Sequence, residues 1–95
     1  MENYEFYQKL IEERNSIREN STKNVYRKKV AVLNQILVTF FEHGDELLKQ
    51  FYIFKVDVER HEIISILENV GISASVVEVN YSYIDGNTYQ VNILN

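Results

Sequence analysis

Apolar side chains recur every three or four residues along the first 43 positions, which is the spacing of amphipathic helices. One such stripe runs through residues 3–19 and a second through residues 23–43. The spacing breaks between them, where Ser21 or Thr22 can act as the N-cap of the second helix. Gly44 then occupies the position at which many helices end in a left-handed residue. The sequence therefore predicts two helices joined by a short turn.

The second helix has an alternative, because it contains many β-branched side chains and these favour strands. They are Val30, Val32, Ile36, Val38 and Thr39. A strand over residues 30–42 would accommodate them. We favour the helix, because the apolar residues follow a period of 3.6 more closely than they alternate.

The next segment changes from helical to strand spacing. Residues 51–56 are dense in aromatic and β-branched side chains and predict a strand. Asp57 can then serve as the N-cap of a helix that continues through Val70, and Gly71 followed by Ile72 matches a common helix-ending turn. The buried side of this helix would consist of Ile63, Ile66, Leu67 and Val70.

Two alternating segments at the C-terminus predict a hairpin. Their apolar faces match when Tyr83 lies opposite Tyr89. A two-residue turn would put the two apolar sets on opposite faces of the sheet. The expected loop is therefore the three residues 85–87, with Asn87 in the left-handed position.

Together these elements predict a single α+β domain over residues 1–95. An N-terminal helical hairpin (1–44) is followed by a β-α-β-β unit (45–95) with a small antiparallel sheet. In element order and in its Gly71-Ile72 turn, the second unit resembles half of a ferredoxin-like sandwich, as used by ACT-type regulatory domains. The resemblance implies a fold and no activity.

Composition adds a cellular setting. The chain has no cysteine, which fits a reducing cytoplasm, and no apolar run reaches the roughly 18–20 residues of a membrane span. Its acidic start lacks the basic residues of a signal peptide. We expect a soluble, cytoplasmic protein whose small core favours homo-oligomers. Many Asn and Ile residues, with no Pro or Trp, indicate an AT-rich coding sequence, which is typical of low-GC bacteria and their mobile elements.

Charge singles out one end of the helical hairpin. The net charge of the chain is −4, yet the segment from Arg14 to Lys29 has a net charge of +5. Arg14, Arg18 and Lys29 interrupt the apolar stripes, and an unpaired cation in a core costs several kcal/mol. In an antiparallel hairpin the three cations meet, with Tyr7 and Tyr26 nearby. These five residues are the predicted binding site for an anion such as a nucleotide phosphate.

Two other arrangements would also satisfy these cations. They can pair within the chain with Glu42, Asp45 or Glu46, as buried charges usually do. They can also meet the carboxylates of a second copy at a subunit interface. All three alternatives stay open on the sequence alone.

The sequence contains no recognisable catalytic motif. The serines lack a Gly-x-Ser-x-Gly setting, and His43 and His61 have no evident nucleophile beside them. Asp57 and His61 lie one helical turn apart, but two ligands do not make a metal site. We therefore expect no enzyme activity, metal or cofactor. An isoelectric point near 5.1 also makes nucleic acid an unfavourable partner.

The remaining expectation is binding to protein. An acidic surface around Asp57, Glu59 and Glu62 suits a basic partner. The sequence predicts a non-enzymatic protein that blocks or regulates a partner, such as a phage or plasmid inhibitor of host defence machinery. The alternative is an oligomer that binds and sequesters a small anionic ligand, such as a nucleotide, at the cationic site.

Overall fold

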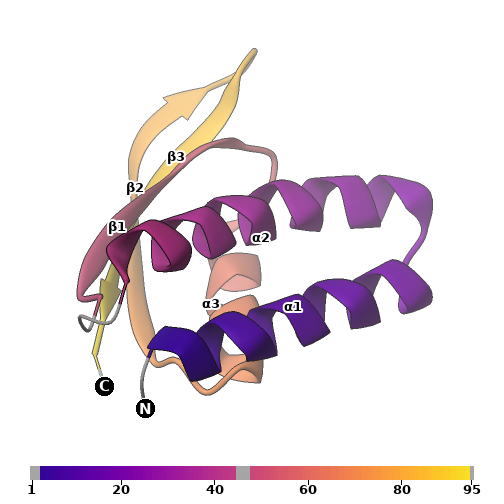
Figure 1. The fold of residues 1–95 in the computed structure, drawn as a ribbon. Helices are drawn as coiled ribbons and strands as arrows, with labels where there is room; N and C mark the ends of the chain where they lie inside the picture. The colour runs from indigo at the N-terminus through magenta and orange to yellow at the C-terminus, as the bar shows by residue number, and fades with distance from the viewer. Residues whose placement is uncertain (1–2, 45–47, 95) are drawn as a thin grey trace.

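The computed structural model describes residues 3–44 and 48–94. In chain order its elements are α1 (Asn3–Asn20), α2 (Lys23–His43), β1 (Gln50–Val56), α3 (Arg60–Asn69), β2 (Ala74–Ser82) and β3 (Gly86–Ile93). Figure 1 shows α1 and α2 side by side and antiparallel, with the helices on one side of the sheet. The predicted α+β architecture is confirmed, and residues 30–42 are helical.

The three strands are arranged in the order β1-β3-β2, and β3 runs antiparallel to both neighbours. Strands β1 and β2 are therefore parallel to one another, with β3 inserted between them and α3 connecting them. This split β-α-β arrangement is the one found in half of a ferredoxin-like sandwich, as the element order predicts. Helix α2 packs beside β1 and α3 beside β2.

The helical hairpin forms where apolar spacing and capping agree. Thr22 is extended, and its hydroxyl accepts a hydrogen bond from the Val25 amide at 3.4 Å. Both helices bury one stripe in a shared core. It comprises Phe6, Leu10 and Ile17 of α1 and Val32, Leu33, Ile36, Leu37 and Phe40 of α2. The predicted stripes are wider than this buried face, because Tyr4 and Phe41 are exposed.

Helix α3 begins two residues later than predicted, because the chain stays extended while Val58 enters the core. Glu59, rather than Asp57, is the N-cap. The Glu59 amide donates to the Glu62 carboxylate at 2.6 Å, as in a capping box. At the other end Gly71 is left-handed, and its amide and the next one donate to carbonyls of the last turn, as predicted. Burial confirms the predicted inward side of α3: Ile63, Ile66, Leu67 and Val70.

The C-terminal hairpin forms, but its predicted register is wrong. Tyr89 pairs with Glu78, five residues away from the predicted partner Tyr83. A shift by an odd number of residues exchanges the two faces of a strand. Val76 therefore packs in the core, whereas Val77 points to the opposite face of the sheet.

The turn of this hairpin is also displaced. Residues 83–85 form the loop, and Gly86 rather than Asn87 is left-handed, with φ of 98°. Gly86 passes so close to β1 that a Cβ would lie 2.9 Å from the Val56 carbonyl oxygen. Glycine is therefore required at this position for both its φ angle and its lack of a side chain.

Candidate functional site

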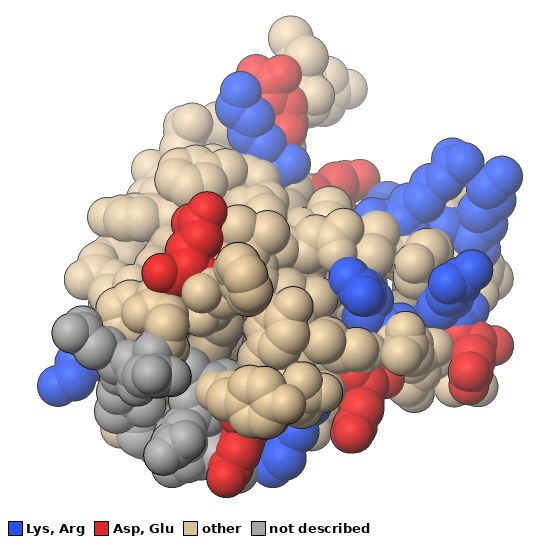
Figure 2. All heavy atoms as spheres, in the orientation of Figure 1, with Lys and Arg blue, Asp and Glu red and all other residues tan. Residues whose placement is uncertain are grey.

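The five residues of the predicted anion site differ in their exposure and contacts. Arg14 is half-buried, and its Nη1 donates a hydrogen bond to Asn34 Oδ1 at 3.1 Å. Lys29 is also half-buried, but Arg18 is exposed, so the expectation that it faces the core is wrong. Arg18 lies in the last turn of α1, where the hairpin opens to solvent. Figure 2 shows Lys and Arg side chains gathered most densely at this end of the molecule.

Within the described residues, Arg14 is therefore hydrogen-bonded to a neutral amide and not to a carboxylate. Among residues 3–44 and 48–94, none of the three predicted cations forms an ion pair. An ion pair in this part of the chain joins Lys28 to Asp57 at 3.2 Å. Two of the predicted counter-charges, Asp45 and Glu46, lie in the segment that the structure does not describe.

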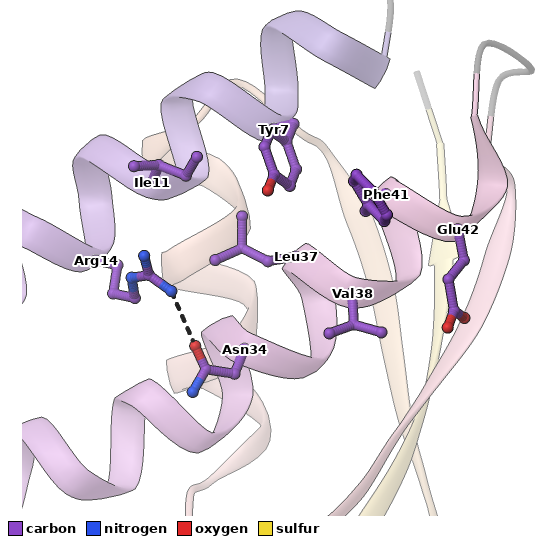
Figure 3. Close-up of a pocket in the computed structure, with 8 residues that line it drawn as sticks. All are labelled: Tyr7, Ile11, Arg14, Asn34, Leu37, Val38, Phe41 and Glu42. Carbon is purple, nitrogen blue, oxygen red and sulfur yellow. Dashed lines mark hydrogen bonds between the residues drawn. The ribbon is translucent and has the colours of Figure 1, made fainter.

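A groove between α1 and α2 contains two of the five predicted residues. Tyr7 and Arg14 line it, whereas Arg18, Tyr26 and Lys29 do not. Its volume is about 390 Å³, and its lining is Tyr7, Ile11, Arg14, Asn34, Leu37, Val38, Phe41 and Glu42. Figure 3 shows Arg14 and Glu42 at opposite ends of this set, with apolar side chains between them. Nucleotide binding by the five residues stays a prediction.

The acidic residues predicted to contact a partner also make contacts within the fold. Asp57 is exposed and pairs with Lys28 of α2. The Glu62 carboxylate accepts the Glu59 amide at the start of α3. Asp57 and Glu59 are exposed, and contact of the three residues with a partner stays a prediction.

The outer face of the sheet is a candidate binding surface that the sequence pattern did not predict. The register places Tyr52, Gln90 and Val77 in one row across the three strands, on the face away from the helices. In the regular part of the sheet this outer face consists of Gln50 and Tyr52 of β1, Gln90 and Asn92 of β3, and Ser75 and Val77 of β2. Phe54 and Val79 continue it at the bulges of β1 and β2, beyond which Asn80 pairs with Thr88. Its four large apolar side chains, Tyr52, Phe54, Val77 and Val79, are 44–56% exposed.

The two regular rows of the outer face, residues 50, 92 and 75 and residues 52, 90 and 77, carry no charged side chain, although a quarter of the chain is charged. The rings of Tyr52 and Phe54 stack with centroids 5.9 Å apart. Beside them an apolar hollow leads to α2, lined by Asn34, Gln35, Val38, Thr39, Tyr52 and Phe54. The face is therefore continuous with the exposed side of α2.

The edge of β1 is closed beside this face by one side chain. Gln35 of α2 donates from Nε2 to the Phe54 carbonyl and accepts the Phe54 amide on Oε1, both at 2.7 Å. The amide thus takes the place of a neighbouring strand at that position. This closure disfavours the addition of a strand to β1 at Phe54.

Tyr89 is the described titratable group whose pKa is clearly shifted. Burial raises the pKa of its phenol, while a hydrogen bond from Asn87 acts in the opposite direction. The hydroxyl donates to the Val58 carbonyl at 2.8 Å and so ties β3 to the segment before α3. The shifted pKa has a structural cause, and the Tyr89 hydroxyl points into the fold.

Comparisons of the chain with protein-family models, with curated proteins and with solved structures find no match. Within the described part of the chain, no group of three or more His, Cys, Asp or Glu is placed to hold a metal ion. No helix in that part has the length and apolar character needed to span a membrane. The proposed function therefore rests on the fold and on the outer face of the sheet.

Proposed function

We propose that this chain is a non-enzymatic binding protein that blocks or regulates a partner protein, and that the partner docks flat on the outer face of the sheet. The observation that carries the proposal is the combination of exposed Tyr52, Phe54, Val77 and Val79 with an absence of charge in the regular rows of that face. Large exposed apolar patches on small proteins commonly mark interaction sites.

The composition of the outer face favours protein over the other partner classes. Interface centres are depleted in charged residues and enriched in aromatic ones, as this face is. Nucleic acid would require Lys or Arg toward the phosphates, and those side chains gather at the far end of the helical hairpin. The partner surface should therefore be apolar and uncharged. That it belongs to host defence machinery remains a prediction from composition.

Site-specific photocrosslinking in the native host cell tests this proposal. A benzophenone amino acid replaces Tyr52 on the outer face, and in a matched chain it replaces Tyr83, which is 90% exposed at the hairpin tip. We expect one dominant product heavier than two copies of the chain from position 52 and no dominant product from position 83. Adding Val79→Asp to the position-52 chain should reduce that product at least about tenfold, because it places a charge in the contact.

The same experiment can contradict the proposal in two ways. Equal, diffuse labelling from positions 52 and 83 would mean that the outer face has no specific partner. A product from position 52 that contains only two copies of this chain would make the face a self-association surface. Circular dichroism of each variant must match the parent chain, so that loss of a product reports on contact and not on folding.

A further inference from the structure

The exposed side of the helical hairpin carries a second, separate pattern. Residues of α1 at positions 4, 7, 11 and 14 and residues of α2 at positions 34, 38 and 41 follow the alternating three- and four-residue spacing of a helix-packing seam. These positions hold Tyr4, Tyr7, Ile11, Arg14, Asn34, Val38 and Phe41. They flank or line the groove described above, and Phe41 is 73% exposed. Figure 1 shows this side of α1 and α2 uncovered.

The charges of this groove are arranged about its centre. Arg14 is held at one end by Asn34, and Glu42 lies at the other end. Val38 stands midway, four residues from Asn34 and four from Glu42. At 1.5 Å per residue, each end is about 6 Å from Val38 along α2. A two-fold axis through Val38 would therefore bring each Arg14 to the partner's Glu42.

We propose that a second copy of this chain occupies the groove, forming a symmetric dimer through α1 and α2. In this dimer the two copies of α2 cross in opposite directions at Val38. Arg14 of each copy pairs with the partner's Glu42. The charges of the surface are self-complementary, as a two-fold interface requires.

The size of the surface is near the lower limit for a dimer. Helices of 18 and 21 residues are about 27 and 31 Å long, and two side by side are about 20 Å wide. The resulting face, on the order of 500–600 Å², approaches the roughly 800 Å² per partner that stable complexes bury. Asn34 and Val38 also line the hollow beside Tyr52 and Phe54, so this dimer would lie next to the β1 side of the outer face and leave its β2 side available to a different partner.

Charge exchange between copies tests the dimer directly. Sedimentation equilibrium of the parent chain should give twice the 11.3 kDa chain mass at about 100 µM. Arg14→Glu and Glu42→Arg should each raise the dimer Kd at least about tenfold, because like charges then face each other across the interface. Mixing the two variants should restore the dimer, since the new carboxylate at position 14 of one chain then meets the new guanidinium at position 42 of the other.

Restoration on mixing is the decisive result, because a role of these residues within one chain would not produce it. The matched control is Val77→Asp, on the sheet, which should leave the dimer Kd unchanged. A folded parent chain that stays monomeric at the same concentration overturns the proposal. So does a monomer that retains a small molecule in native mass spectrometry, or a mixture of the two variants that fails to associate. Dissociation by Val77→Asp alone would assign self-association to the sheet and would contradict the proposed function instead.

Discussion

At the scale of single residues, two polar side chains connect the layers of the fold. Gln35 joins α2 to the edge of β1 through Phe54, and Tyr89 joins β3 to the carbonyl of Val58. Neither bond can be inferred from sequence spacing, because the partners lie 19 and 31 residues apart. Both bonds help to fix the orientation of the sheet whose outer face we propose as the docking surface.

Tyr89→Phe should destabilise the protein by about 1–3 kcal/mol at pH 8, because the buried Val58 carbonyl loses its hydrogen-bond donor. The loss should shrink at alkaline pH. Burial raises the pKa of Tyr89 in the folded state, so the folded chain holds this proton after the unfolded chain has released it. The parent's stability from this group is therefore complete below about pH 10 and is lost as pH rises through the raised pKa.

Urea unfolding between pH 8 and pH 11 measures this difference. Tyr83→Phe is the matched control, since Tyr83 is exposed and should show no effect at any pH. If the gap between the parent and Tyr89→Phe stays constant up to pH 11, the buried phenol does not couple to folding.

At the scale of elements, local signals predicted the helices well and the hairpin poorly. The bounds of α1 and α2 follow from apolar spacing and the Thr22 cap, which involve neighbouring residues only. The start of α3 was displaced because Val58 is drawn inward by the rest of the core. The hairpin register depends on which face of β2 meets the helices, and both faces of β2 carry valine. Local sequence cannot decide between two apolar faces.

Gly86→Ala should cost more stability than Gly44→Ala, although both glycines have positive φ angles. At Gly44 an added Cβ would meet no atom within 4 Å, so the cost is backbone strain alone, about 1–3 kcal/mol, because residues with a side chain rarely adopt φ 76° with ψ −140°. At Gly86 the Cβ would also lie 2.9 Å from the Val56 carbonyl oxygen, which must move. We expect at least about 1 kcal/mol more for Gly86→Ala, measured by urea unfolding. Equal costs would show that β1 and β3 separate easily at the turn.

At the scale of the whole molecule, charge and apolar surface occupy different ends. Cations gather where α1 meets α2, and the regular rows of the outer face of the sheet are uncharged. Of the cations predicted to share one anion site, Arg14 lies in the groove beside a neutral partner and Arg18 lies in solvent. A sequence pattern locates charges along the chain, but only the packing decides which of them face each other.

The orientation of the sheet is the property of the whole molecule on which the proposed function depends, and a pair of adjacent residues tests it. Val76 is 3% exposed and Val77 is 48% exposed. Val76→Ala should cost about 2 kcal/mol or more through a cavity against the helices, whereas Val77→Ala should stay within about 0.5 kcal/mol of the parent. Urea unfolding of the two variants gives both values. The register expected from sequence requires the opposite order, because it turns Val77 toward the core. A costly Val77→Ala would therefore remove the exposed apolar face and the docking surface with it.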